Sequence, residues 1–262
     1  MQLGNHLLLV IHTKDKKKSL AFYQKLGFRV LKKNTDNIIL SRGKNLFLLH
    51  FGNLNKNIKL VSFCPKIALT AAKLRFKKIK TTWTKNKQQD SKEATFKISE
   101  KFGILLSNDA QYDISSESLT DEVATEKMGK FVEYGLYTKD FEADLLSLQS
   151  IGFKRVLYSE CFSMSAILKH KQLQIGLYKN YENEEKHCLT FYSKNIQQHI
   201  DKLEKEGLKW AEKLLPNQTG GFNAAKLISP EQLDIWLFKS SVYGMKLINM
   251  PPSKASSYLN SK

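Results

Sequence analysis

The chain has 262 residues, of which 42% are hydrophobic, and its formal net charge at pH 7 is +17. This size suits one large or two small domains with real cores, and the absence of an apolar run of about 18 residues excludes a transmembrane helix. The first segment, MQLGNHLLLVIH, has no basic region before its short apolar run. We therefore expect a strand there and no signal peptide.

The three cysteines, Cys64, Cys161 and Cys188, are odd in number and far apart. This spacing fits neither a disulfide framework nor a CxxC metal site, so each is expected to be a small buried side chain. The cysteine pattern favours a reduced, cytoplasmic setting.

The positive charge is concentrated in the first half, because residues 1–120 carry a net charge of +15 and residues 121–262 carry +2. A basic half can bind an anionic partner, and the stretch TAAKLRFKKIKTTWTK gathers basic residues around Trp83. The alternative is a solvated, lysine-rich surface, since lysine reads phosphates and bases less well than arginine. No nucleic-acid motif is present, so we do not expect a nucleic acid as the partner.

In chain order, the first unit begins with the apolar run HLLLVIHT at residues 6–13, which has the length of a strand. Asp15 and Ser19 can begin a helix, and Gly27 can end it. Between them, the apolar residues Leu20, Phe22, Tyr23 and Leu26 recur at near-helical spacing. Three further strands are expected at residues 28–32, 37–41 and 45–51. The order is strand, helix, strand, strand, strand.

The same order recurs from residue 131, where FVEYGLYT is a strand, residues 141–151 are helical and Gly152 ends the helix. The strands FKRVLYS, SMSAILK and QLQIGLYK follow. A second unit is expected from residue 58, with its helix at IALTAAKLRFKK, and a fourth from residue 187, with its helix at NIQQHIDKLEKEG. The sequence therefore predicts one unit repeated four times.

A small sheet with one helix cannot bury its apolar face alone, so the units should pair. We predict an α+β fold in which four βαβββ modules form two domains with curved, mostly antiparallel sheets that enclose clefts. The expected domains are residues 1–110 and 129–240. The polar, acidic segment 111–128 is interpreted as a linker, and residues 241–262 as a disordered or loosely docked tail.

The helix and its flanks carry a signature that the first and third units share. In the first unit it consists of Asp15, Ser19, Phe22, Tyr23, Leu26, Gly27 and Phe28. The third unit repeats it with Asp140 and Ile151-Gly152-Phe153, and SPEQLDIWLF at residues 229–238 matches the end of such a unit. Over about nine-tenths of its length the chain resembles the vicinal oxygen chelate superfamily, which includes glyoxalase I, fosfomycin and bleomycin resistance proteins and extradiol dioxygenases. The resemblance implies two glyoxalase-like domains in tandem, as in the dioxygenases.

In this superfamily a divalent metal lies in a cleft between two units, held by His or Glu from the first and last strands of each unit. In the first unit these positions fall on Leu8 and Leu48, which cannot bind a metal, and the last strand of the second unit offers no acid. His6, His12 and His50 share the strand face of the lost positions. They could form a displaced polar cluster, or they are ordinary partly buried histidines.

The second half keeps two suitable side chains at the first-strand positions. In the third unit, Glu133 lies seven residues before Asp140, the signature Asp at the start of the helix. In the fourth unit, Lys194 is taken as the equivalent of that Asp, and His187 lies seven residues before it. The last-strand positions fall on Gly176 and Trp236. Because catalytic zinc usually has three protein ligands, the resemblance implies a degenerate site, with no cofactor or with a weakly held divalent ion such as Fe, Mn, Ni or Zn.

Two further interpretations concern the last strand of the fourth unit. A slipped register would place Asp234 on the same face as a third ligand. Alternatively, Trp236 is an aromatic on the cleft floor that stacks on a planar ligand, with Tyr134 and Phe191 on neighbouring strands lining the same cleft. Core packing is the alternative for each of these aromatics.

Three functions therefore stand as hypotheses. The first is binding of a small molecule, anionic or aromatic, in the second cleft without a metal. The second is a metal-dependent lyase or dioxygenase-like enzyme that uses Glu133 and His187. The third is polyanion binding by the basic half. The sequence leaves open whether the clefts form within each half or across a homodimer, and the fold alone does not choose among the chemistries.

Overall fold

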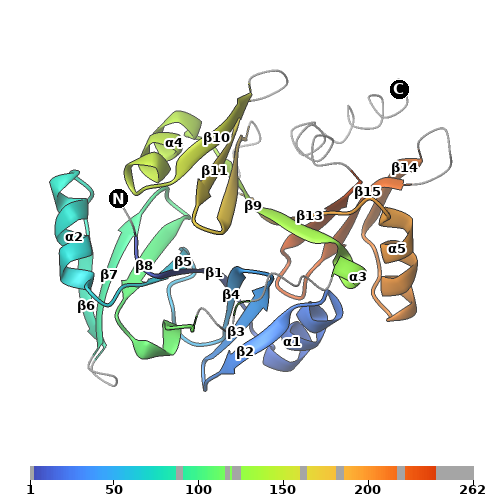
Figure 1. Cartoon of the computed structure of the whole chain (residues 1–262), viewed down its shortest axis with the longest axis horizontal. Helices are drawn as coiled ribbons and strands as arrows, with labels where there is room; N and C mark the ends of the chain where they lie inside the picture. The colour runs from blue at the N-terminus through green and yellow to red at the C-terminus, as the bar shows by residue number, and fades with distance from the viewer. Residues whose placement is uncertain are drawn as a thin grey trace.

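The computed structural model describes residues 3–86, 91–115, 119, 125–159, 164–180, 186–216 and 222–239. The chain forms two eight-stranded sheets that carry helices, and the two halves follow one another along the sequence (Figure 1). Among the described residues, none of the helices has the length and apolar character needed to cross a bilayer. The expected tail at residues 241–262 lies outside the described residues.

The first sheet is built from two consecutive βαβββ modules. Their elements are β1 (His6–His12), α1 (Lys16–Lys25), β2 (Arg29–Lys33), β3 (Asn37–Arg42), β4 (Asn45–His50), β5 (Ile58–Phe63), α2 (Ile67–Phe76), β6 (Thr82–Asn86), β7 (Ser91–Lys97) and β8 (Gly103–Ser107). The strand order is β2-β3-β4-β1-β5-β8-β7-β6. A 3₁₀ turn η1 (Ala110–Tyr112) and a short helix α3 (Thr125–Met128) follow this sheet.

The second sheet repeats the plan. Its elements are β9 (Lys130–Thr138), α4 (Phe141–Ser150), β10 (Lys154–Ser159), β11 (Ser165–His170), β12 (Leu173–Lys179), β13 (His187–Tyr192), α5 (Ile196–Lys205), β14 (Glu212–Pro216), β15 (Phe222–Ile228) and β16 (Asp234–Phe238). Its order is β10-β11-β12-β9-β13-β16-β15-β14. In both sheets the two modules meet through their first strands, which pair antiparallel as β1 with β5 and β9 with β13. The prediction of an α+β fold with four βαβββ modules is therefore confirmed.

The signature around the first helix has a direct structural cause. The Asp15 side chain caps α1 by accepting a hydrogen bond from the backbone N–H of Lys18 at 2.9 Å. The helix ends at Gly27, whose φ of +86° is a left-handed conformation that glycine adopts without strain. Phe28 then enters the core together with Tyr23 and Leu26, so this short stretch determines where the helix begins, where it ends and which side is buried.

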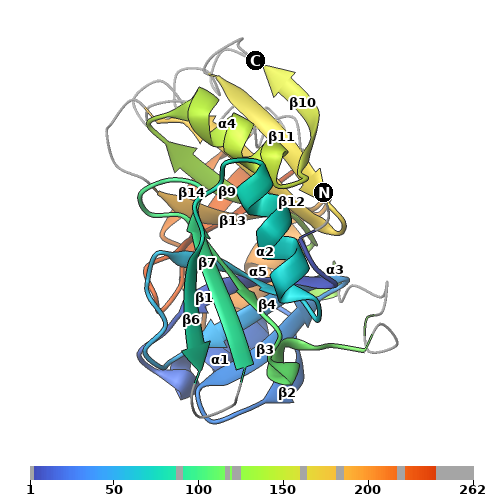
Figure 2. The ribbon, with the colours of Figure 1, turned by 90° about the vertical axis from the view of Figure 1, so that its left-hand side faces the viewer.

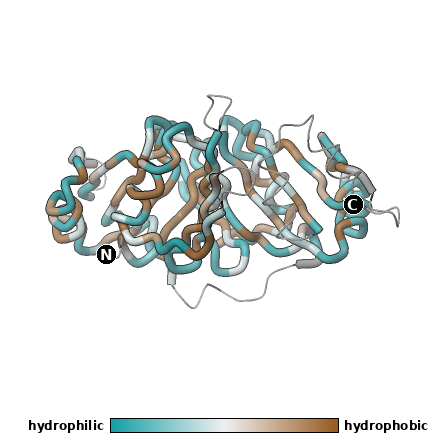
Figure 3. The backbone as a smooth tube through the Cα atoms, turned by 90° about the horizontal axis from the view of Figure 1, so that it is seen from above, coloured by the Kyte–Doolittle hydropathy of each residue, from teal (hydrophilic) through white to brown (hydrophobic). Residues whose placement is uncertain are grey.

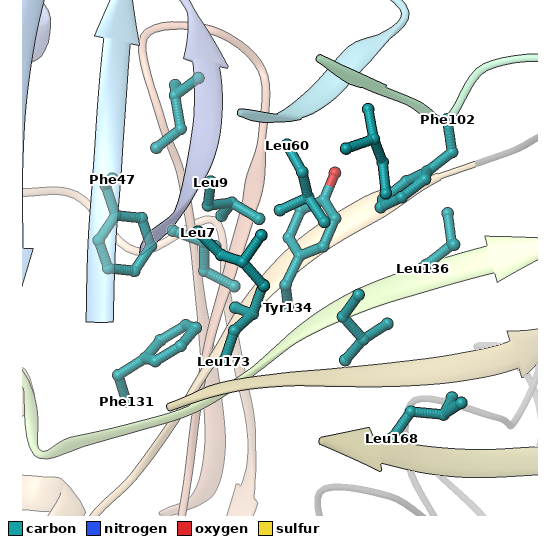
Figure 4. Close-up of a cluster of buried hydrophobic side chains, with 14 of the residues drawn as sticks. Leu7, Leu9, Phe47, Leu60, Phe102, Phe131, Tyr134, Leu136, Leu168 and Leu173 are labelled. Atoms are coloured by element: carbon teal, nitrogen blue, oxygen red, sulfur yellow. The ribbon is translucent and has the colours of Figure 1, made fainter. Parts of the chain in front are cut away.

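One apolar core lies between the two sheets. Along β1, Leu7 and Leu9 point into this core, whereas Leu8 and Val10 point to the opposite face, as strand alternation requires. In Figure 4, Leu7 and Leu9 lie beside Phe131 and Tyr134 of the second half. Figure 3 shows the hydrophobic segments running through the middle of both halves, with hydrophilic segments at the outer turns.

Aromatic side chains pack across the interface between the two halves. The ring centroids of Phe47 and Phe131 are 5.2 Å apart, and those of Phe28 and Phe191 are 6.2 Å apart, both in edge-to-face geometry. Such pairs add about 0.5–1.5 kcal/mol each beyond the area that they bury. The two sheets therefore behave as one packed body.

A polar contact between the halves leads to the first prediction. Glu231, in the turn before β16, accepts hydrogen bonds from the hydroxyls of Ser19 and Tyr23, and the Tyr23 contact is 3.1 Å long. Both hydroxyls belong to fully buried residues of α1. The hydroxyl of Ser19 keeps a second partner, the hydroxyl of Thr13 at 2.6 Å. Because hydrogen bonds to a charged group contribute about 1.5–3 kcal/mol, we expect Glu231→Ala to lower the free energy of unfolding by about 1–3 kcal/mol.

Urea unfolding monitored by circular dichroism would measure this loss. The matched control is Glu204→Ala, since Glu204 is exposed and bonded only at the surface to Lys213. The control should change the free energy of unfolding by less than about 1 kcal/mol. Equal effects of the two substitutions would show that the buried contact adds nothing.

The face of the first sheet that points away from the second sheet is called the first hollow. It is formed by Leu8, Val10, Ile39, Leu48 and Leu105. Residues after β8 cover it, because the side chains of Tyr112 and Ile114 are buried in this cluster and Leu119 packs against it. Part of the segment that the sequence presents as a polar linker is thus a plug for the first sheet.

The basic segment around Trp83 lies on an outer side of the molecule. In Figures 1 and 2, α2 and α4 lie on this same side, and Nζ of Lys77 donates to the backbone oxygen of Ser150 at 2.6 Å. Phe76, at the end of α2, is 92% exposed, and Trp83 is 38% exposed. The surface is therefore basic and partly apolar.

Candidate functional site

The second sheet has a cavity on its face that points away from the first sheet. We call it the second hollow, and its volume is about 250 Å³. Its lining residues are Val132, Glu133, Val156, Leu157, Ile167, Gln174, Thr190, Phe191, Tyr192 and Phe238. Most of the wall is apolar, while the side chains of Glu133, Gln174, Thr190 and Tyr192 carry polar atoms.

Glu133 is held in the floor of the second hollow by its neighbours. Its side chain is only 2% exposed, and one carboxylate oxygen accepts a hydrogen bond from the hydroxyl of Tyr178. Gly176 leaves the space for this carboxylate, since a Cβ on Gly176 would lie 2.6 Å from Oε1 of Glu133. Any larger residue at position 176 would displace Glu133.

Burial controls the ionisation of Glu133. It raises the pKa of this carboxyl to about 7, and hydrogen bonds from Tyr178 and Gln174 offset the shift only in part. Near neutral pH the carboxyl is therefore divided between its neutral and charged forms. The neutral form can donate a hydrogen bond to a ligand, and the charged form can only accept one.

The floor beside Glu133 is filled by aromatic and thiol groups. The rings of Tyr137 and Tyr178 stack with centroids 5.2 Å apart. Cys188 is buried next to Gly135, where a Cβ would clash with its Sγ. Burial raises the pKa of the Cys188 thiol to about 12, so it stays protonated at neutral pH.

Comparison with known proteins assigns the architecture. No protein-family model and no curated protein matches the sequence. Among solved structures, homoprotocatechuate 2,3-dioxygenase from Arthrobacter globiformis is similar with a TM-score of 0.59 at 16% identity, over 90% of this chain and 80% of that one. The Mn(II)-bound glyoxalase from Novosphingobium aromaticivorans is similar with a TM-score of 0.57 at 12% identity, over 88% and 80%.

A homoprotocatechuate 2,3-dioxygenase from Brevibacterium fuscum gives a TM-score of 0.57 at 14% identity, over 91% of this chain and 72% of that one. The chain has the tandem vicinal oxygen chelate fold. The likeness covers both sheets, so the arrangement that the sequence resemblance implies is present.

The N-caps of the helices show which residues of the second half stand at the positions where the sequence resemblance places metal ligands. The helices α4 and α5 have Asp140 and Asn195 as their N-caps, and seven residues before these caps stand Glu133 and Cys188. Lys194 stands one residue before the cap of α5, so the prediction that begins this helix at Lys194 selects His187 instead of Cys188. A shift of one residue along a strand moves a side chain to the other face of the sheet.

The structure accordingly does not bring Glu133 and His187 together. In the pairing of β9 with β13, Glu133 faces Thr190 and His187 faces Leu136, so the two side chains lie on opposite faces. The ring of His187 stacks on Tyr134, with centroids 5.5 Å apart. Burial lowers the pKa of His187 to about 3.

The residues at the four positions where the sequence resemblance places metal ligands in the second sheet do not fit a catalytic metal. Gly176 pairs with Gly135 and Trp236 pairs with Thr190, so these two residues hold the last-strand positions and offer no ligand atom suited to a metal. One carboxylate and one buried thiol remain, whereas catalytic sites usually supply three protein ligands. Throughout the described ranges, no group of three or more His, Cys, Asp or Glu side chains is arranged to hold a metal ion.

Asp234, the ligand expected from a slipped register, and the three aromatics predicted to line one cleft do not all lie in the same cavity. Asp234 lies at the start of β16 and lines a groove between the halves, not the second hollow. Trp236 is on the hollow face of β16 and stacks on Phe238, with centroids 5.6 Å apart. Phe191 borders the second hollow but is fully buried, and its ring packs against Phe28 and Phe131 in the core between the sheets. Tyr134 points to the opposite face, into the core between the sheets.

In the first sheet the predicted metal positions, Leu8 and Leu48, are fully buried in the first hollow. The histidines nearby form hydrogen bonds within the protein. Nδ1 of His50 lies 2.6 Å from Oδ1 of Asn37, and Nε2 of His12 lies 2.9 Å from the backbone oxygen of Ile58. His6 stands 3.6 Å from the carboxylate of Asp113. These contacts explain the histidines as packing and hydrogen-bonding residues.

A second cavity, of about 1070 Å³, is the groove between the two halves. Its charged lining residues are Lys14, Asp15, Lys18, Lys56, Lys59, Lys186, Glu231 and Asp234. Sequence reasoning missed this groove, because its walls come from strand ends and turns that meet only when the two halves pack. Its mixed charges contrast with the apolar, single-sheet enclosure of the second hollow.

Proposed function

We propose that the second hollow binds a small molecule with a single aromatic ring that carries a hydroxyl group. The observation that carries this proposal is a cavity of about 250 Å³ with apolar walls and one buried carboxyl, Glu133, at its floor. A dry apolar cavity of about 150 Å³ is already large enough for benzene. Few, convergent polar groups in an apolar pocket are typical of small-molecule sites.

The chemistry of the polar groups selects the ligand class. Glu133 and Gln174 can exchange hydrogen bonds with a phenolic hydroxyl, while Val156, Leu157 and Ile167 contact the ring. The comparison structures support this class, since they include a dioxygenase in complex with HPCA. In this chain we infer binding without metal-dependent turnover, because the family positions hold Gly176 and Trp236.

Isothermal titration calorimetry with phenol, catechol and homoprotocatechuate would test the proposal. At least one should bind, and Leu157→Arg should weaken its binding at least tenfold, because Leu157 lines the second hollow and is 43% exposed. The matched control is Leu146→Arg on α4, where Leu146 is 65% exposed and away from the cavity. The proposal fails if none of the three compounds binds, or if both substitutions weaken binding equally.

A further inference from the structure

The groove between the two halves is the larger of the two cavities, and it has charged walls. Its volume of about 1070 Å³ is at the upper end of the range for small-molecule sites. Five lysines and three carboxylates line it, together with three histidines, His12, His50 and His187. Where its charges of each sign lie therefore decides what the groove can bind.

The acidic groups gather at one part of the groove. Asp15 caps the start of α1 with its side chain. Glu231 accepts hydrogen bonds from the hydroxyls of Ser19 and Tyr23 in the same helix. Asp234 begins β16, at the end of the turn that holds Glu231. Two of the three carboxylates thus already bond to the protein itself, where α1 begins and the turn before β16 meets it.

The part of the groove at His12 and His187 is positively charged. Burial lowers the pKa of both histidines, and neighbouring lysines lower it further. The charge of Lys59 acts on both rings. Lys56 adds to it at His12, and Lys101 does so at His187. Both rings are therefore mainly neutral at pH 7, and the positive charge around them comes from lysines.

The backbone of β5 sets the position of Lys59. In the pairing of β5 with β8 the register shifts between Ile58 and Leu60, so Lys59 is the bulged residue. In the second sheet, the five residue pairs of β13 with β16 run without a shift. In Figure 4, Leu60 is among the side chains of the core, together with Tyr134. Lys59 instead lines the groove, and β-bulges often re-aim a side chain beside a ligand site.

His187 offers a hydrogen-bond donor at the same place. Its Nδ1 is buried and has no hydrogen-bond partner among the described residues. Because buried N–H groups without a partner are rare, we assign the ring proton to Nε2, the accessible ring nitrogen. Stacking on Tyr134 fixes the plane of the ring. The Nε2–H group therefore supplies a donor of fixed direction in the wall of the groove.

We propose that this part of the groove is a second binding site, for a small molecule that carries a phosphoryl group. Lys56 and Lys59 supply positive charge, and Nε2–H of His187 donates to a phosphoryl oxygen. A phosphoryl group has three acceptor oxygens and up to two negative charges, so it can use all three donors, whereas a carboxylate has two oxygens and one charge. The half-buried side chains of Phe51 and Leu54 line the same groove and suit an organic part of the ligand.

The inference goes beyond the proposed function, because among the described residues none lines both this groove and the second hollow. Isothermal titration calorimetry at low salt tests it with inorganic pyrophosphate, AMP and glucose 6-phosphate. These probes separate an inorganic ligand, a nucleotide and a sugar phosphate. Citrate serves as a multiply charged anion without phosphorus. At least one of the three phosphates should bind with one molecule per chain and more tightly than citrate.

Two double variants show where the phosphate binds. Lys56→Gln, Lys59→Gln removes both charges and keeps most of each side chain, and it should weaken binding at least tenfold. The matched control is Lys73→Gln, Lys80→Gln, which removes the same charge at two exposed lysines outside the groove and should weaken binding less than twofold. His187→Phe keeps a flat ring without the donor and should weaken binding at least threefold. Circular dichroism confirms that each variant is folded.

Three results would overturn the proposal. None of the three phosphates binds, or citrate binds as tightly as they do, or the two double variants weaken binding equally. In the last case the loss reflects the net charge of the protein and not a site.

Catechol titration of the Lys56→Gln, Lys59→Gln variant separates this inference from the proposed function. Weaker phosphate binding with unchanged catechol binding supports two separate sites, whereas joint loss of both ligands overturns the second site. If catechol binds neither protein while phosphate binding responds as expected, the groove site stands and the ligand class of the second hollow is wrong.

Discussion

Replacement of Arg42 by alanine is expected to lower the free energy of unfolding by about 2–5 kcal/mol, because it leaves two buried carbonyls without a donor at a cost of about 1–3 kcal/mol each. Arg42, at the end of β3, is only 2% exposed. Its guanidinium donates to the backbone oxygen of Gly27 at 2.9 Å and to that of Gly129 at 2.6 Å. One side chain therefore joins the turn after α1 to the chain that enters the second sheet.

The large effect has two physical sources. Burial lowers the pKa of Arg42 to about 10, so the group remains charged at neutral pH and depends on these two carbonyls for its solvation. Alanine would leave both carbonyls without their donor. It would also create a cavity beside Phe191, whose ring centroid is 6.0 Å from the guanidinium carbon. Because the contact spans the two halves, its loss should weaken their packing as well as β3.

Denaturant unfolding would measure the effect, with Arg155→Ala on β10 as the matched control, because Arg155 is exposed. The control should change the free energy of unfolding by less than about 1 kcal/mol. Arg42→Lys should fall between the two, since an ammonium lacks the fork that reaches two separate oxygens. A loss of less than about 1 kcal/mol in Arg42→Ala would show that water replaces the guanidinium at both carbonyls.

The modules could be predicted from the sequence because local rules and tertiary packing agree at the same residues. Asp15 caps a helix, Gly27 ends it in a left-handed conformation, and Phe28 enters the core. The second module gives a weaker signal for a visible reason. Its helix ends at Lys78, which takes the left-handed position with φ of +61° in place of a glycine.

The position of the metal ligand in the fourth unit was predicted wrongly, because it depends on where the following helix begins. The choice between His187 and Cys188 depended on whether Lys194 or Asn195 begins the helix, and Asn is the better N-cap residue by its chemistry. A shift of one residue in the start of the helix moves the selected position to the other face of the strand. Preference for asparagine as the cap would have selected Cys188 from sequence alone.

Contacts between distant segments were beyond sequence reasoning. The linker prediction rested on the polar composition of residues 111–128, yet Tyr112 and Ile114 are buried in the first hollow. The signal that could have found them is two large apolar residues, two positions apart, in an otherwise polar stretch. Nothing in a single sequence indicates that Arg42 would meet Gly129, because this contact exists only after both sheets have formed.

Replacement of Glu133 by glutamine is expected to stabilise the protein at pH 8 by up to about 3 kcal/mol and to change little at pH 4.5, because the pKa of this carboxyl is raised from 4.5 to about 7 in the folded state. The folded protein then binds the proton more tightly than the unfolded chain does. The Glu133 contribution to stability is fully present below pH 4.5, is lost as the pH rises through 7, and stays lost above it.

Glutamine keeps the shape of the side chain and an oxygen that can accept the hydrogen bond from Tyr178, but it never carries a charge. The difference in free energy of unfolding between the two proteins, measured in urea from pH 4.5 to 8, isolates the carboxyl. Burial lowers the pKa of His170 to about 4 and that of His187 to about 3, so both destabilise the fold in acid. These effects occur in both proteins and cancel in the difference.

The matched control is Glu212→Gln, which makes the same substitution at an exposed glutamate. The prediction is wrong if the free energies of unfolding of the unmodified protein and the Glu133→Gln variant differ by the same amount at every pH from 4.5 to 8. Water or a rearranged partner would then solvate the carboxylate, and the second hollow would contain more water than its lining indicates. A window centred between pH 4.5 and 7 would instead identify Glu133 as a carboxyl that is neutral in a substantial fraction of molecules near neutral pH. That neutral form is the hydrogen-bond donor that a phenolic ligand would meet at the floor of the second hollow.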